Sequence, residues 1–187
     1  MEMLLSLWLP ILVGAVVVFF ASFLAWAILP HHKPDVKYLP DEDALFALLK
    51  AQNVEPGQYM FPKCEHADAK NPEMLARYKA GPWGLLRVWP SEVNMGKNLA
   101  ATFTLFLIIT AVIGYLAGVA LPRGAEFIDV FAFTAIAGVL AHTAGGMLGE
   151  VWFTKPLRAK VMDFVDGVVY GLLTGLIFAL LWPGLPA

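Results

Sequence analysis

Among the polar side chains inside segments apolar enough to cross a membrane, four could together carry chemistry. They are His142, Asp166, Tyr170 and Thr174. Polar groups in lipid are energetically costly, so they are functional candidates by default. Asp166, Tyr170 and Thr174 recur every fourth residue, which places them in one row on a helix. At about 1.5 Å per residue, His142 and Tyr170 lie about 12 and 13 Å from the same end of their segments, so the two rings are expected at one level.

This row predicts an intramembrane relay of protons or ions, because an imidazole changes its protonation near neutral pH. The structural alternative is a buried histidine that donates one hydrogen bond and keeps two helices in register. The sequence favours this alternative, because beyond Thr174 the last apolar segment offers few groups that pass a proton.

No cofactor, metal site or catalytic residue is predicted within one chain. A haem bound through His142 would need a second axial ligand on a facing helix, and only Met147 or a neighbouring subunit offers one. His31 and His32 are adjacent, so their side chains diverge on a helix and make a poor chelate. We expect this pair among lipid headgroups.

The motif Cys64-Glu65-His66 offers too few ligands for a structural zinc site, which usually has four. Cys64 also lacks a visible base and orienting group, so nucleophilic catalysis is not predicted. As the single cysteine of the chain, it has no disulfide partner within it.

The composition identifies the class of protein. The chain has 187 residues, of which 59% are hydrophobic and 15% charged, with a net charge of −2. Typical soluble domains have roughly 45–50% apolar and about 25% charged residues. The absence of a strong basic charge argues against nucleic-acid binding, and the hydrophobicity excludes a disordered chain.

Long gaps between charged blocks define the architecture, since about 20 apolar residues cross a bilayer. Four gaps have this length: Leu4–Leu29, Leu99–Leu121, Phe127–Gly149 and Val161–Trp182. They predict an all-α membrane protein, a four-helix transmembrane bundle. Its parts would be a first span over 1–29, a small mixed cytoplasmic segment over 30–97, and a three-helix unit over 98–187.

The distribution of Lys and Arg predicts the orientation, because cytoplasmic loops retain positive charge. Nine basic residues lie in 30–97 and three between the third and fourth spans, against only Arg123 between the second and third. Both termini are therefore expected outside, with segment 30–97 in the cytoplasm.

Segment 30–97 is too polar for membrane and too short to bury a large core. Helices are predicted over 44–52, after an acidic first turn, and over 72–79, with Asn71 as cap. The runs 58–61 and 85–89 predict two short strands. We expect this ribbon to lie at the membrane surface, where tryptophan and tyrosine are favoured.

Small residues spaced four apart predict close helix packing, because lipid gives helices no hydrophobic reason to associate. The rows are Gly114 and Gly118 in the second span and Gly167, Gly171 and Gly175 in the fourth. In the third span, Gly138, His142 and Gly146 share a row beside Ala141, Gly145 and Gly149.

Charged residues gather where the fourth span begins. Asp163 and Asp166 follow Lys155, Arg158 and Lys160. The carboxylates are expected to pair with these cations or to complement the helix N-terminus. The three cations are also candidates for contact with anionic lipid.

Several runs carry a resemblance over nearly the whole chain, and they end with a Tyr-Gly-Leu-Leu-Thr-Gly run that begins at Tyr170. The earlier runs are Leu-Pro-Asp-Glu-Asp-Ala from Leu39, Pro-Gly-Gln-Tyr-Met-Phe-Pro from Pro56, Gly-Pro from Gly81 and Met-Gly-Lys from Met95. The chain resembles a group of uncharacterised bacterial inner-membrane proteins with four predicted spans. The resemblance implies that location and supplies no functional residues.

Together these features predict a non-catalytic membrane protein, an accessory or scaffold subunit of a larger bacterial complex. Its expected partners are the lipid bilayer and other membrane subunits or further copies of itself. The alternative is a small transporter or proton-linked channel that uses the polar row.

Overall fold

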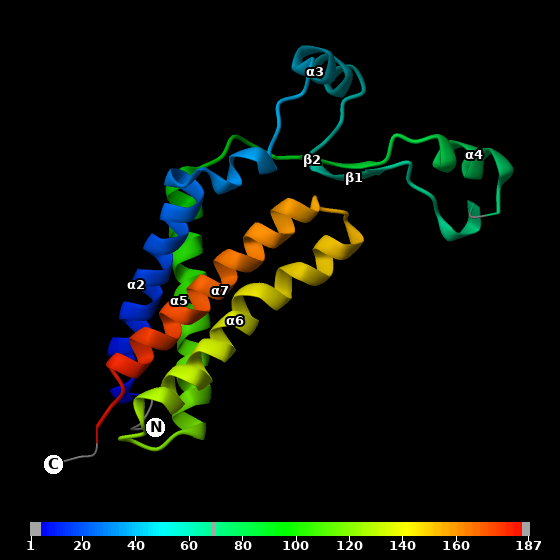
Figure 1. Cartoon of the computed structure of the whole chain (residues 1–187). Coiled ribbons are helices and arrows are strands. Elements are labelled where there is room, and N and C mark those ends of the chain that lie inside the picture. The colour runs from blue at the N-terminus through cyan, green and yellow to red at the C-terminus, as the bar shows by residue number, and fades with distance from the viewer. Residues whose placement is uncertain (1–4, 69, 185–187) are drawn as a thin grey trace. The chain divides into compact units, whose positions relative to one another are not determined.

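A computed structural model describes residues 5–68 and 70–184 (Figure 1). The chain divides into two compact units. One contains the residues up to Lys37 together with Asn94 and the residues after it, and the other is Tyr38–Val93.

Four long apolar helices make up the first unit. They are α2 (Trp8–Phe23), which continues through a π-helical turn, η1 (Leu24–Ile28); α5 (Met95–Ala120); α6 (Phe127–Trp152); and α7 (Leu157–Leu180). Each is long and apolar enough to cross a membrane, with mean hydropathy between 1.7 and 2.6. The predicted all-α bundle with four spans is confirmed.

Helices α6 and α7 are longer than their apolar runs. α6 continues three residues past Gly149, and α7 begins at Leu157, directly after Pro156. Proline in this position is compatible with a helix start, because its missing N–H would have no partner in the first turn. Thr154, with φ of 53°, reverses the chain in the short connection.

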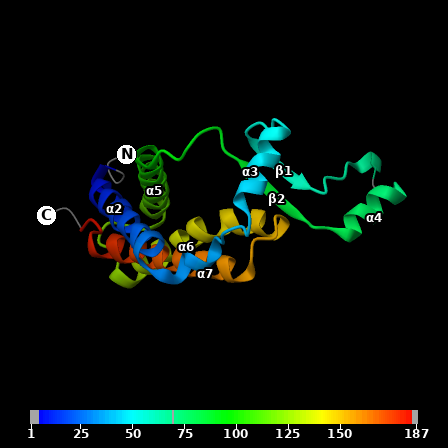
Figure 2. The same ribbon diagram turned by 90° about the horizontal axis from the view of Figure 1, so that it is seen from above.

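Backbones meet where α6 crosses α7. A Cβ added to Gly138 would lie 2.8 Å from the Cα of Gly171, and one added to Gly171 would lie 2.8 Å from the Cα of Val139. Larger side chains would force these helices apart. In both views α6 and α7 stay side by side and lean away from α5 toward their connecting turn (Figures 1 and 2).

The end of the bundle where α2 begins and α7 ends is closed by packed apolar side chains. Leu7, Ile113, Val130 and Phe178 are buried together there. A backbone hydrogen bond links the turn before α6 to the residues after α7: Gly124 N–H donates to the carbonyl of Pro183 at 2.9 Å. The first span belongs to this core, since α2 packs against both α5 and α7.

The chain leaves α2 through irregular backbone. Leu29 N–H donates to the carbonyl of Leu24 at 2.9 Å, closing the π-helical turn. Leu29 itself is extended, and a 3-10 helix, η2 (Pro30–Asp35), follows. Because η2 packs on α7, residues 30–37 belong to the helical unit. The sequence had instead suggested a polar segment that begins at residue 30.

The second unit contains two short helices and a ribbon. Its elements are α3 (Glu42–Ala51), β1 (Gly57–Phe61), η3 (His66–Asp68), α4 (Pro72–Ala80) and β2 (Gly84–Val88). The strands are antiparallel, with Gly57 opposite Val88. Both helices have the side-chain caps that the sequence suggests: Ala44 N–H donates to Asp41 at 2.9 Å and Glu73 N–H to Asn71 at 3.0 Å.

Candidate functional site

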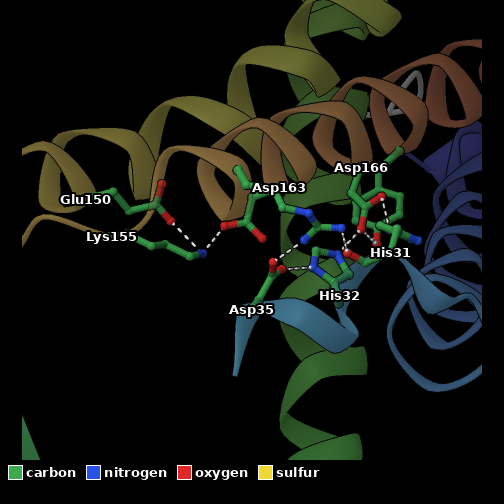
Figure 3. A network of polar contacts seen from close by, with 9 residues as sticks. His31, His32, Asp35, Glu150, Lys155, Asp163 and Asp166 are labelled. Atoms are coloured by element: carbon green, nitrogen blue, oxygen red, sulfur yellow. Dashed lines mark hydrogen bonds and ion pairs between the residues drawn. The ribbon is translucent and has the colours of Figure 1, made fainter. Parts of the chain in front are cut away.

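Two histidines and an aspartate meet where α2 ends beside α7 (Figure 3). His31 Nε2 lies 3.1 Å from Asp166 Oδ1, and His32 Nε2 lies 2.9 Å from Asp166 Oδ2. His32 and Asp166 are buried, whereas the side chain of His31 is 24% exposed. We call His31, His32, Asp35 and Asp166 the His–Asp centre.

This arrangement differs from the expected divergence of the two histidine rings. Regular helical spacing would direct the two rings apart, but the chain here passes from a π-turn through extended Leu29 into a 3-10 turn. The rings lie 4.3 Å apart between centroids, and both turn toward Asp166. Trp26, on the π-turn, stacks on His32 with 3.8 Å between ring centroids.

Asp35 accepts a hydrogen bond from the second ring nitrogen of His32, Nδ1. Its Oδ2 lies 2.7 Å from His32 Nδ1. Burial alone would lower the pKa of His32, but its hydrogen bonds and charge interactions with Asp166 and Asp35 outweigh burial and raise this pKa above the usual value. The hydrogen bond from His32, aided by the charge of Arg158, lowers the pKa of Asp35.

Arg158 anchors the turn that carries these histidines to α7. It donates to Asp35 Oδ1 at 2.5 Å and to the carbonyl of His31 at 2.6 Å. The sequence anticipated a carboxylate partner for Arg158 within its own helix; the observed partner comes from a segment 123 residues earlier.

The structure joins two residues of the predicted polar row. The hydroxyl of Tyr170 donates to Asp166 Oδ2 at 3.4 Å. Thr174 is buried, but its hydroxyl donates to the backbone carbonyl of Tyr170 at 2.8 Å, a bond within its own helix. The side-chain hydrogen bonds along this row therefore run from the His–Asp centre to Tyr170.

His142 lies near Tyr170 without joining the row. Its ring packs edge-on against Tyr170 and Phe106, with centroids 5.7 Å away in both cases. Its Nε2 is buried and has no hydrogen-bond partner among the described residues. The expected meeting at one level is thus observed as ring packing, and the hydrogen bond that would hold two helices in register does not involve Nε2.

An apolar groove of about 720 Å³ lies beside the centre. Phe19, Phe23 and Trp26 line it from the first span, and Leu99 and Phe106 line it from α5. Tyr170 also lines this groove, so one side chain contacts the groove and donates to Asp166.

Lys155, Glu150 and Asp163 form a second ion-pair group near this end. Lys155 contacts both Asp163 and Glu150, in the latter case at 3.0 Å (Figure 3). These bonds raise the pKa of Lys155 although its partial burial alone would lower it. Of the two carboxylates expected to pair with cations here, Asp163 does so and Asp166 takes the histidines instead.

The glycines proposed for packing fall into different environments. On α7, a Cβ added to Gly167 or Gly175 would lie 2.6 Å from Thr143 or Ala135 of α6. On α5, one added to Gly114 would lie 3.0 Å from Ile11, while Gly118 is half-buried. Gly146 has only its own helix's Glu150 nearby, at 4.0 Å.

The motif Cys64-Glu65-His66 is on the exposed surface of the second unit. The thiol of Cys64 is free, and Glu65 pairs with Lys63 at 2.7 Å.

Sequence reasoning did not identify Asp35 and did not select His31 and His32. The run Pro30-His31-His32-Lys33-Pro34-Asp35 did contain a signal. Its two prolines are typical of a tight turn directly after a span, and Asp35 follows His32 by three residues.

Comparisons of the chain with protein-family models, with curated proteins and with solved structures found no match. The resemblance to bacterial four-span proteins therefore stays a prediction.

Proposed function

We propose that this multi-pass membrane protein is a non-catalytic accessory or scaffold subunit that binds a transmembrane helix of another protein. The observation that carries the proposal is an open row of small residues on α6. Ala141, Gly145 and Gly149 are spaced four apart and exposed. A Cβ added to Gly145 or Gly149 would have no described neighbour within 4 Å.

The row lies in the second half of α6, the half that leans away from α5. Nearer the start of α6, Val130 and Thr134 are buried, and His142 still contacts Phe106 of α5. Beyond that level the two helices separate (Figure 1). A small-residue row permits close approach of another backbone, which is the main source of helix association in lipid.

The neighbouring row shows what such residues do in this protein. Gly138 lies on the same helix and brings α6 into backbone contact with Gly171 of α7. The open row also consists of small residues, so a transmembrane helix is the partner that fits it.

The alternative, a small transporter or proton-linked channel, is supported by the bond between Asp166 and Tyr170. It is less well supported than the accessory function, because Thr174 bonds within its own helix and His142 Nε2 lacks a described partner.

We also propose that the protein lies in a bacterial inner membrane with both termini outside and residues 38–93 in the cytoplasm. The support is the charge distribution, in which twelve of the thirteen basic residues fall on one side of the spans. Short loops rich in Lys and Arg remain cytoplasmic.

The test replaces Gly145 and Gly149 together by leucine. The complex is extracted gently from its native membrane, and its subunits are counted by native mass spectrometry. We expect a stoichiometric companion with the wild type and its loss with Gly145→Leu/Gly149→Leu, at unchanged thermal stability of this chain. The control is Ala132→Leu, an enlargement at another exposed site of α6.

Retention of the companion by the double variant would refute the proposed binding face. A wild type that is extracted only as a homo-oligomer would refute the accessory function and favour the transporter.

A further inference from the structure

We infer that His31, His32 and Asp166 bind one divalent first-row transition-metal ion. Two imidazole nitrogens and one carboxylate oxygen from these residues lie within 4.8 Å of one another. This inference rests on the His–Asp centre and is independent of the partner helix proposed for α6.

The separations fit a common ligand sphere. Nitrogen and oxygen ligands about 2.0–2.2 Å from Zn²⁺ lie about 3.4 Å apart in a tetrahedral site. The two imidazole nitrogens are 3.1 and 2.9 Å from the Asp166 oxygens that they face. Small rotations of three side chains would therefore direct one atom of each toward a single ion.

The donor types indicate the class of metal. Imidazole favours Zn²⁺, Fe²⁺ and neighbouring ions, whereas Ca²⁺ and Mg²⁺ prefer sites made of oxygen. Two neutral imidazoles and one carboxylate carry one negative charge, which a divalent cation overcompensates. Three protein ligands also leave positions on the ion open.

Residues around His32 orient its ring in the way that neighbours of metal-binding histidines do. A ligating histidine usually donates its other ring N–H to a carboxylate or carbonyl. Asp35 accepts from His32 Nδ1 at 2.7 Å, which leaves Nε2 for a metal. Arg158 fixes Asp35, and Trp26 stacks on the ring of His32.

The ligand set is reachable from solvent on one side and adjoins the apolar groove on the other. His31 is partly exposed, so an ion can enter from the polar side. Tyr170 donates to Asp166 and lines the apolar groove, so only this side chain separates the groove from the ligand Asp166.

The experiment measures metal binding by the full chain in detergent, purified with a tag that contains no histidine. After treatment with a chelator, the protein is titrated with Zn²⁺ by calorimetry, and bound metal is counted by mass spectrometry. We expect one Zn²⁺ per chain. Co²⁺ at the same stoichiometry should give visible absorption bands typical of nitrogen and oxygen ligands, and Zn²⁺ should remove them.

Variants separate the centre from adventitious binding. His32→Ala and Asp166→Asn should each weaken Zn²⁺ binding by more than about 100-fold, since even outer partners of metal ligands contribute 10–100-fold. The matched control is His66→Ala, which removes an exposed histidine beside Cys64 and should leave the affinity unchanged.

His31→Ala provides a second test should the buried variants fail to fold, because the side chain of His31 is partly exposed. It should lower the affinity and abolish the thermal stabilisation that Zn²⁺ gives the wild type. The inference is overturned if the wild type binds no Zn²⁺, if His31→Ala binds it as tightly as the wild type, or if His66→Ala alone removes it. The cluster would then be an ion-pair network only.

Discussion

His32 meets a carboxylate at each ring nitrogen, Asp166 at one and Asp35 at the other. In the neutral ring only one nitrogen donates, whereas the imidazolium donates from both. Without a metal, the contacts therefore favour the protonated ring. A metal on Nε2 would replace that proton while the bond to Asp35 persists, so Asp35 has the same role in both states.

The role of Asp35 can be measured separately from that of the ligands. Asp35→Asn keeps the size of the side chain but removes its charge, which weakens the hold on His32 and on Arg158. We expect Zn²⁺ affinity to fall about 10- to 100-fold at unchanged stoichiometry.

Calorimetry of this variant beside the exposed-carboxylate control Asp68→Asn provides the measurement. Equal affinity of Asp35→Asn and the wild type would show that Asp35 does not orient His32.

Among the elements, α6 and α7 form the closest pair, and glycine makes this possible. The Cα of Gly171 faces Gly138, and a Cβ added to Gly171 would lie 2.8 Å from the Cα of Val139. Both neighbours are backbone atoms, which cannot rotate away as a side chain can. Substitution here must move a whole helix.

Gly171→Ala should therefore destabilise the protein. Overpacking typically costs about 1–3 kcal/mol, which thermal or denaturant unfolding in detergent would detect. Gly145→Ala is the matched control, because its added Cβ has no described neighbour within 4 Å and should leave stability unchanged or slightly higher. Equal stability of the two variants would contradict the described crossing of α6 and α7.

The sequence predicts the spans and much of their packing because both depend on local patterns. Each span is one long, largely apolar run, and the glycines of α7 recur every fourth residue on one helix face. Gly146 shows the limit of this reasoning, since a row identifies a helix face but not which faces are covered.

The His–Asp centre was less predictable, for two physical reasons. His32 and Asp166 are separated by 134 residues, so their contact depends on how the first and last spans pack. The orientation of His31 and His32 also depends on a π-turn followed by a 3-10 turn, which the regular helical period does not describe.

For the whole molecule, the orientation in the membrane is testable with its single cysteine. Cys64 is exposed in the unit formed by residues 38–93. If this unit is cytoplasmic, a maleimide that does not cross membranes should label Cys64 in inverted vesicles but not in intact spheroplasts.

The control moves the thiol to the opposite side. In a Cys64→Ser background, Glu126→Cys places it at the exposed turn before α6, and this variant should be labelled in intact spheroplasts. Labelling of Cys64 in intact spheroplasts would reverse the proposed orientation.

The accessory role also belongs to this scale, since it requires a second protein. The bundle is closed where α2 begins and α7 ends, and α6 exposes its small-residue row where it leans away from α5. An open row of this kind is a surface on which another transmembrane helix can pack closely in lipid.

The most direct test is the subunit composition of the wild-type protein after gentle extraction from its native membrane, determined by native mass spectrometry. We predict this chain in a fixed ratio with a different membrane protein. A monomer, or an assembly that contains this chain alone, would contradict it.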